Sequence, residues 1–248
     1  MKSVLCSLLC LLSFCHALAG EAAKEVVTVG AEDDWAPYSS VVDRQAKGFA
    51  VDVVREAYAL VGITVKFDVL PYSRCMAATK AGTLVACFDA VPNAMIAKDY
   101  LWPDLPLFTT HMNVYALADS KDSGMVARKL EGRTVGVERG YEYGDEFDLN
   151  TKIIRKIVDK NDQGFKMLLA RRIEFMAAEE RIANALFIRF PTEFGGKFKL
   201  VGTVATPGLF IAFSKTAPDS VRLLKKFNEG YAILRNSPRY RAIEAKWF

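Results

Sequence analysis

The stretch Gly48–Leu70, GFAVDVVREAYALVGITVKFDVL, decides the fold because it joins an amphipathic helix to a strand. Its first half spaces apolar residues so that they share one face of a helix. These residues are Val53, Val54, Ala57, Tyr58 and Val61. Gly62 follows as a typical helix stop. The next residues, TVKFDVL (64–70), alternate between apolar and polar, which is typical of a strand.

The segments on either side continue this alternation of helix and strand. EVVTVG (Glu25–Gly30) precedes it and reads as a strand. SRCMAATKAG (Ser73–Gly82) follows as a short helix, and TLVACF (Thr83–Phe88) as a third strand. The order strand, helix, strand, helix, strand predicts a parallel sheet.

The rest of the chain repeats the pattern and then returns. A second α/β unit spans about residues 119–203, after which a strand-like run leads into two closing helices. We therefore predict an α/β fold of two lobes, the second inserted into the first. Lobe 1 is expected to comprise residues 26–114 and 206–248, and lobe 2 residues 115–205. Because open parallel sheets bind ligands beyond the carboxyl ends of their strands, two facing lobes predict a ligand cleft between them.

The N-terminal segment indicates export. Lys2 is followed by an apolar run from Val4 to Phe14, and Ala17 and Ala19 have the spacing of a signal-peptidase site. We expect residues 1–19 to be a cleaved signal peptide and the remaining chain to be exported and soluble. An alternative is a lipid anchor at Cys15, but the bulky Phe14 stands where such sites carry a small residue.

Composition argues against several classes of function. The 248-residue chain has 33 Lys and Arg and 29 Asp and Glu, interspersed, so neither nucleic acid nor a membrane surface is an expected partner. After the signal peptide only His111 and two cysteines remain as nitrogen and sulfur ligands, and they lack metal-site spacing. No phosphate loop, dinucleotide fingerprint or nucleophile elbow is present, and we expect no cofactor.

Cys75 and Cys87 are the two remaining cysteines. They stand twelve positions apart, at the same end of a predicted helix–strand pair, in a compartment where disulfides persist. The helix and the returning strand are of similar length, which brings the two thiols close together. The sequence leaves a disulfide and a pair of buried free thiols equally open.

Strand ends in the first lobe supply the first candidate site residues. Trp35 and Tyr38 follow the first strand, where they line a ligand pocket or belong to the core. Arg74 lies at a helix start, an unfavourable place for a cation unless an anion accompanies it. The alternative for Arg74 is an ordinary surface position. Asp89 and Asn93 follow the third strand, where free backbone N–H groups converge.

Two strand ends in the second lobe add three more. Tyr141 and Glu142 lie in a turn after the strand RTVGVERG (Arg133–Gly140). Glu179 lies at a predicted helix N-terminus, where a carboxylate either caps the helix or, if it faces the cleft, binds an ammonium group.

In this order the segments resemble the extracellular solute-binding proteins of family 3, the periplasmic receptors for polar amino acids in ABC uptake systems. The resemblance covers nearly the whole chain after the signal peptide. It rests on WAPYS (35–39), the stretch from Gly48 to Phe67, LEGRTVGVERG (130–140), LLARRIEFMAAEE (168–180) and the terminal YRAIEAKWF (240–248). It implies a monomeric, non-catalytic periplasmic protein that binds a small polar solute and delivers it to a membrane ABC permease.

The resemblance also implies roles for individual residues. Trp35 and Tyr38 match the aromatic residues of the family's ligand pocket, and the loop from Asp89 matches its ligand-contacting loop. Tyr141 and Glu142 match the turn that meets the ligand's carboxylate. Glu179 matches an acid that accepts the α-ammonium group.

Three positions depart from the family pattern: Ala97, Tyr141 in the turn, and Val85 in the third strand. The arginine that holds the α-carboxylate is replaced by Ala97, and the neighbouring Lys98 lacks the planar fork of an arginine. Arg74 is the arginine expected to supply that fork from the adjacent strand end. A standard α-amino acid is therefore in question as the ligand.

Two other functions share this scaffold. One is a dehydratase-like enzyme that would use Glu179 or Glu142 as acid or base, although no His or Cys partner stands at a strand end. The other is a sensory protein that presents its ligand-bound form to a receptor.

Overall fold

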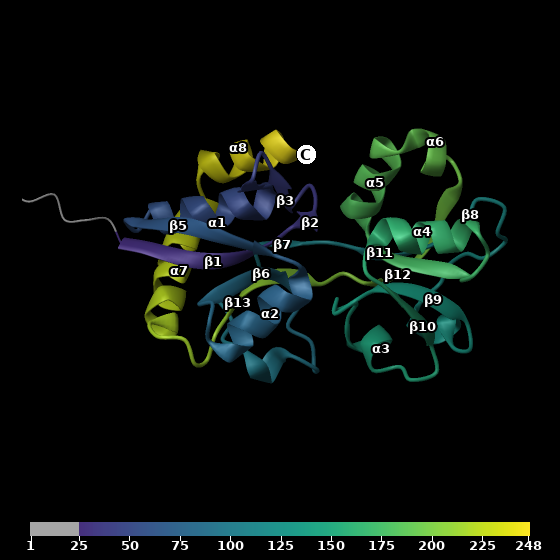
Figure 1. Ribbon diagram of the computed structural model, residues 1–248, viewed down its shortest axis with the longest axis horizontal. Coiled ribbons are helices and arrows are strands. Elements are labelled where there is room, and N and C mark those ends of the chain that lie inside the picture. The colour runs from purple at the N-terminus through teal and green to yellow at the C-terminus, as the bar shows by residue number, and fades with distance from the viewer. Residues whose placement is uncertain (1–24) are drawn as a thin grey trace, which may run out of the picture.

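The computed structural model describes residues 25–248. The predicted signal peptide at residues 1–19 and the alternative anchor at Cys15 lie outside the described residues. Figure 1 shows two α/β halves side by side.

The first half is built on a mixed five-stranded sheet. In spatial order its strands are β5 (Ile63–Leu70), β1 (Glu25–Glu32), β6 (Ala86–Ala90), β13 (Gly208–Phe213) and β7 (Phe108–Thr109). The parallel arrangement predicted for β5, β1 and β6 is confirmed, while β13 runs antiparallel to both of its neighbours. The carboxyl ends of the three parallel strands therefore meet at one edge, which faces the second half (Figure 1).

Helix α1 (Phe49–Ala59) anchors this half as its periodicity predicts. Val53, Val54, Ala57 and Tyr58 are fully buried. Each large apolar side chain buried in this way contributes roughly 1.5–3 kcal/mol. The helix packs closely on α7 (Ser220–Arg235), where a Cβ added to Gly230 would lie 1.9 Å from the carbonyl oxygen of Ala57. The half is completed by α2 (Tyr72–Ala81), α8 (Pro238–Trp247) and the 3₁₀ turn η1 (Ala97–Asp99).

A small three-stranded sheet, which the sequence analysis did not predict, connects β1 to α1. It comprises β2 (Asp34–Trp35), β3 (Ser39–Val42) and β4 (Gln45–Lys47). Gly48 ends it with φ 151°, and a Cβ there would lie 2.0 Å from the carbonyl oxygen of Tyr38. This close approach requires glycine, and it fixes the backbone that carries Trp35 and Tyr38 toward the second half.

The second half has its own mixed sheet. In spatial order its strands are β10 (Ile154–Val158), β9 (Thr134–Glu138), β11 (Phe175–Glu179), β8 (Met112–Leu117) and β12 (Phe198–Ala205). The first three are parallel, and β8 is antiparallel to β11 and β12. Its helices are α3 (Asp145–Asp148), α4 (Asn161–Leu169), α5 (Glu180–Arg189), α6 (Pro191–Phe194) and the 3₁₀ turn η2 (Ala127–Leu130).

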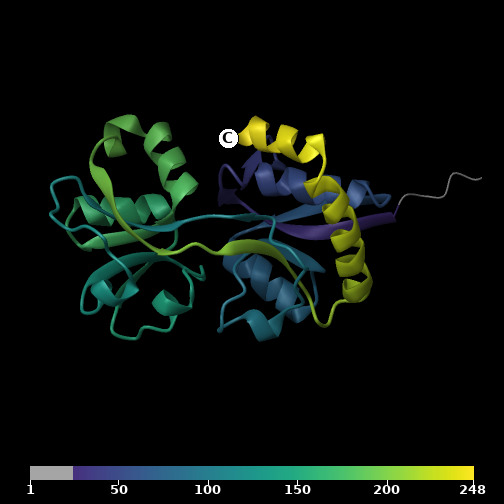
Figure 2. The same ribbon diagram turned by 180° about the vertical axis from the view of Figure 1, so that it is seen from behind.

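The chain crosses between the two sheets twice. One crossing, Thr110–His111, joins β7 to β8, and the other, Thr206–Pro207, joins β12 to β13. The Thr110 N–H donates to the Pro207 carbonyl at 3.1 Å, so the crossings run side by side, as Figure 2 shows from behind. The predicted two-lobed α/β fold with an inserted second lobe is confirmed. The residue limits given above for the lobes stay a prediction.

A candidate ligand-binding cleft between the lobes

An inner cavity lies where the two lobes meet. Both lobes line it, and its walls are acidic, aromatic or apolar: Glu32, Trp35, Tyr72, Asp89 and Val91 from the first lobe, and Met112, Tyr141, Glu142 from the second. Its volume is about 10 Å³, room for at most about one water molecule. The lobes are therefore closed on each other, and a solute enters only if they separate.

Asp89 is the least satisfied residue of this cavity. It lies at the carboxyl end of β6 with φ 69°, a left-handed conformation that few non-glycine residues adopt. Its side chain is buried, and neither carboxyl oxygen has a hydrogen-bond partner among the described residues. Burial, together with the negative charge of Glu179, raises the pKa of Asp89 well above its usual value.

Two hydrogen bonds between a tyrosine and a buried carboxyl close the cavity. Tyr141 of the second lobe donates to Glu32 of the first, and Tyr72 of the first donates to Glu142 of the second at 2.7 Å. Burial raises the pKa of Glu32 well above its usual value, and it raises the pKa of Glu142 to about 8. Glu32 still has one buried oxygen without a partner in the described part of the chain.

Aromatic rings form the rest of the wall. The Trp35 ring lies 4.7 Å from that of Tyr38 and 6.3 Å from that of Tyr141, and Tyr72 meets Tyr141 edge-on at 5.1 Å. Trp35 and Tyr38 are both almost completely buried. Trp35 was expected either to line a ligand pocket or to belong to the core, and in the structure it does both.

Glu179 lies behind the cavity rather than in its lining. It ends β11 and caps α5, accepting the Ile182 N–H at 2.8 Å. Its other oxygen accepts hydrogen bonds from Tyr38, at 3.0 Å, and from Thr110. Both oxygens therefore already have partners, and Glu179 joins the lobes through Tyr38. Its predicted contact with an ammonium group stays a prediction.

Asn93 also joins the lobes. Its side-chain amide donates to Asp148 at 2.8 Å, and its oxygen accepts the N–H groups of Met95 and Ile96. The neighbouring Ala94 N–H donates to Asp145 at 2.8 Å. The loop after β6 is therefore held by hydrogen bonds to α3 of the second lobe.

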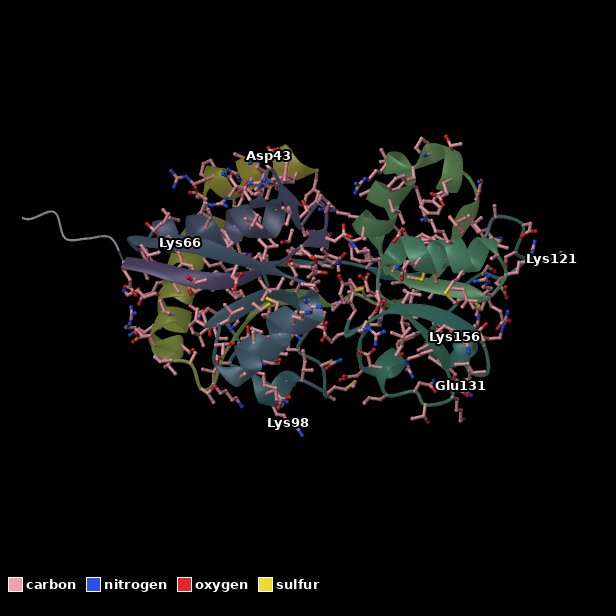
Figure 3. All side chains as sticks on the ribbon, in the orientation of Figure 1. Asp43, Lys66, Lys98, Lys121, Glu131 and Lys156 are labelled. Atoms are coloured by element: carbon pink, nitrogen blue, oxygen red, sulfur yellow. A yellow bond between two sulfur atoms is a disulfide. The ribbon has the colours of Figure 1, made fainter. Side chains whose placement is uncertain are left out.

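Arg74 lies at the mouth of the cleft. It is exposed in the first turn of α2 and lines an outer cavity of about 400 Å³, which shares Glu32, Tyr72 and Tyr141 with the inner one. Lys98, the cation beside Ala97, lies at the lower edge of the first lobe and points outward (Figure 3). Neither cation reaches the inner cavity.

A larger cavity of about 510 Å³ continues the cleft past α5. Asp33, Asp34, Glu138 and Lys160 line both this cavity and the outer one. Lys160 forms an ion pair with Asp34 across the lobes at 2.5 Å. Burial raises the pKa of Glu138 to about 8.

Cys75 and Cys87 form a disulfide, with their Cα atoms 5.9 Å apart. Of the two alternatives left open by the sequence, the structure has the bonded one. The bond ties the first turn of α2 to β6, the strand that carries Asp89.

Residues 25–248 contain neither a metal-binding cluster nor a membrane-spanning helix. No group of three or more His, Cys, Asp or Glu side chains is placed to hold a metal ion there. None of the helices in this range combines the length and apolar character needed to cross a bilayer.

The cleft thus gathers four of the predicted residues in one lining, Trp35, Asp89, Tyr141 and Glu142. Glu32 and Tyr72 belong to the same lining and were not among the predicted site residues. Glu32 lies in the stretch after the expected strand end at Gly30, from which the aromatic Trp35 and Tyr38 were selected, whereas the observed β1 extends to Glu32. Applied to the true strand end, the same rule selects Glu32.

The family assignment rests on the whole described chain. The sequence model of the bacterial extracellular solute-binding proteins, family 3, matches residues 27–248. The chain belongs to this family. No curated protein matches the sequence.

Solved structures similar to this family 3 protein share its fold at low sequence identity. An ancestral arginine-binding protein bound to arginine has a TM-score of 0.75 at 20% identity, over 90% of this chain and 98% of that one. The substrate-binding protein of an amino acid ABC transporter has a TM-score of 0.72 at 20% identity, over 90% of this chain and 99% of that one. A histidine kinase sensor domain similar to periplasmic binding proteins has a TM-score of 0.75 at 22% identity, over 91% of this chain and 97% of that one.

Proposed function

We propose that this family 3 protein captures a small polar solute, an amino acid or a related compound, between its lobes and delivers it to a membrane ABC permease. The observation that carries the proposal is the inner cavity, lined by buried polar side chains from both lobes. Closure of two lobes around fixed hydrogen-bonding groups is how a hinged protein holds a solute. A monomer that works in the periplasm after loss of residues 1–19 fits this function.

We assign the residues three kinds of role. Trp35, Asp89, Tyr141 and Glu142 are proposed to contact the solute, together with Glu32 and Tyr72. Tyr38, Asn93 and Glu179 are proposed to hold the lobes closed, since their polar atoms bond across the cleft. Arg74 is proposed to meet the outer end of the solute. Because Arg74 is exposed, an ion pair there contributes only about 0–1 kcal/mol.

A binding function without catalysis is part of the proposal. The buried carboxyls with raised pKa values are the chemistry that an enzyme on this scaffold would use. The two functions are separated by incubating the purified protein with its best-binding solute and then denaturing it. Mass spectrometry should return the solute unaltered, and appearance of a product would favour the enzyme.

A thermal-shift screen against amino acids, amines and small carboxylates tests the binding function. A true ligand at one hundred times its Kd should stabilise the protein by about 2.7 kcal/mol. The shift should be lost in Trp35→Ala and kept in Asp43→Asn, a control on the outer surface of the first lobe (Figure 3). If Trp35→Ala, still folded by circular dichroism, kept the full shift, the solute would bind elsewhere.

The second candidate function is sensing, which the similarity to a histidine kinase sensor domain supports. Permease and ATPase genes beside this gene would support uptake, and loss of solute uptake on deletion of the gene would establish it. Normal uptake with a lost transcriptional response would support sensing instead.

A further inference from the structure

The inner cavity is acidic and has no compensating positive charge. Three carboxyls line it, those of Glu32, Asp89 and Glu142, and each is at least nine-tenths buried. Within residues 25–248 its lining holds no Lys, Arg or His. Both oxygens of Asp89 and one oxygen of Glu32 lack any hydrogen-bond partner in that range.

Buried carboxyls without partners destabilise a protein, so their presence in the cavity indicates that they bind something there. A buried carboxylate is stable only if it is paired, and otherwise it takes up a proton. Glu32 and Asp89 are close enough for the charge of Asp89 to raise the pKa of Glu32 further. A cation placed between them would supply the missing partner for both.

The aromatic side chains favour an organic cation. Trp35, Tyr72 and Tyr141 line the same cavity. The centroid of the Tyr141 ring lies 5.1 Å from that of Tyr72 and 6.3 Å from that of Trp35. Such faces attract ammonium groups electrostatically, by about 2 kcal/mol or more when the site is desolvated. Among the described residues of the lining, the one buried side-chain N–H without a partner is that of Trp35, and it carries no charge to offset three carboxyls. A ligand carboxylate placed here would therefore meet like charge.

We propose that the inner cavity binds the ammonium group of an organic amine, and that the solute needs no carboxylate. This inference rests on the proposed binding function and narrows its solute class. It departs from an α-amino acid held by an arginine, since Ala97 stands at that position and Lys98 points away (Figure 3).

The outer cavity takes the rest of the solute. It adjoins the inner cavity through Glu32, Tyr72 and Tyr141, so an amine enters with its ammonium group first. Two of the three cations there are already paired, Lys160 with Asp34 and Arg139 with Asp159 at 2.8 Å. Arg74 has no ion pair among the described residues, but its exposure makes any contact with a ligand carboxylate weak.

Matched pairs that differ only by a carboxylate provide the test. Isothermal titration calorimetry on the purified protein compares cadaverine with lysine, putrescine with ornithine, agmatine with arginine and tyramine with tyrosine. In the best-binding pair the amine should bind at least tenfold more tightly than its parent amino acid. Asp89→Asn should weaken that amine at least tenfold, while Asp43→Asn should leave its affinity unchanged. Arg74→Ala should change the affinity for the amine less than threefold.

Each alternative outcome has a defined meaning. Tighter binding of the amino acids, with a tenfold loss in Arg74→Ala, would overturn the amine inference and leave the binding function standing. Binding of none of the eight compounds would also overturn it, and the wider solute screen would then decide the binding function separately. Should Asp89→Asn fail to fold by circular dichroism, Glu142→Gln replaces it with the same expected loss.

Discussion

At the scale of single residues, Asp89 combines three unfavourable features. Its φ is positive, its side chain is buried and its carboxyl has no partner among the described residues. A left-handed non-glycine residue alone costs about 1–3 kcal/mol, and an unsatisfied buried polar group costs a similar amount. Strain of this kind persists where it serves binding, so the same residue should limit the stability of the free protein.

We therefore predict that Asp89→Asn stabilises the ligand-free protein. Asparagine tolerates the left-handed conformation and carries no charge. The raised pKa of Asp89 means that its contribution to stability is lost as pH rises above the ordinary range of an aspartate, so the gain in the variant should grow from pH 4 to pH 8. At pH 8 we expect about 1 kcal/mol or more, roughly 2–4 °C in Tm.

Thermal unfolding of the wild type and of Asp89→Asn at pH 4, 6 and 8 checks this. Asp43→Asn serves as the matched control, because Asp43 is an exposed aspartate, also with positive φ. A variant less stable than the wild type at pH 8 would contradict the idea that Asp89 is strained in the free protein.

At the scale of elements, long periodic segments were predictable and short ones were not. The apolar face of α1 and its end near Gly62 follow from the spacing of Val53 to Tyr58. β2, β3 and β4 have two to four residues each, too few for a period to show. The hairpin that joins β3 to β4 has its turn at Asp43 and Arg44, and both residues have a positive φ. Arginine is not a typical residue for such a turn.

The site was predictable in part for the same reason. Strand ends select residues near the cleft, and Trp35, Asp89, Tyr141 and Glu142 all line it. Which of the selected carboxyls have partners depends on tertiary contacts, since Tyr38 and Thr110 reach Glu179 while nothing described reaches Asp89. No local pattern encodes that difference.

The disulfide carries a prediction at this scale. Closing its loop of twelve residues is worth about 3 kcal/mol by chain entropy. We expect the double variant Cys75→Ala with Cys87→Ala to lose that much, a fall in Tm of roughly 6–12 °C. Amine binding should weaken as well, because β6 and α2 hold Asp89 and Tyr72. Calorimetric melting and titration of the variant measure both effects.

A chemical control separates the bonded form from free thiols. Dithiothreitol should lower the Tm of the wild type and leave the double variant unchanged. Equal melting of the wild type with and without the reductant, with two reactive thiols at Cys75 and Cys87 after denaturation, would mean that the two cysteines are not bonded.

At the scale of the whole molecule, two contacts between the lobes involve buried carboxyls with raised pKa values. Lobe contacts run through Tyr141 to Glu32 and Tyr72 to Glu142, and separation of the lobes is expected to expose these carboxyls to water. The two crossing segments are the natural hinge. An open form hydrates Glu142 and returns its pKa toward the ordinary value of about 4.5 from about 8 in the closed form.

This difference predicts that the free protein opens as pH rises. Between pH 4.5 and 8 the closed form binds more protons than the open one, so raising the pH shifts the equilibrium toward opening. The radius of gyration measured by small-angle X-ray scattering should increase from pH 5 to pH 9. Glu142→Gln should weaken this trend, because its amide oxygen still accepts from Tyr72 but cannot ionise. A constant radius over this range would contradict the prediction.

A bound amine should reverse the trend, which joins the pH dependence to the solute class. The cation stabilises the ionised form of the carboxyls that it pairs with inside the closed cleft, so binding releases protons that the free closed form holds. Affinity should therefore rise with pH up to about 8, where Glu142 of the free protein ionises. Titrations in buffers of different ionisation enthalpy count the protons released, and a solute bound through its carboxylate would release none from these groups. A single proton count thus distinguishes the two orientations of a solute in the cleft.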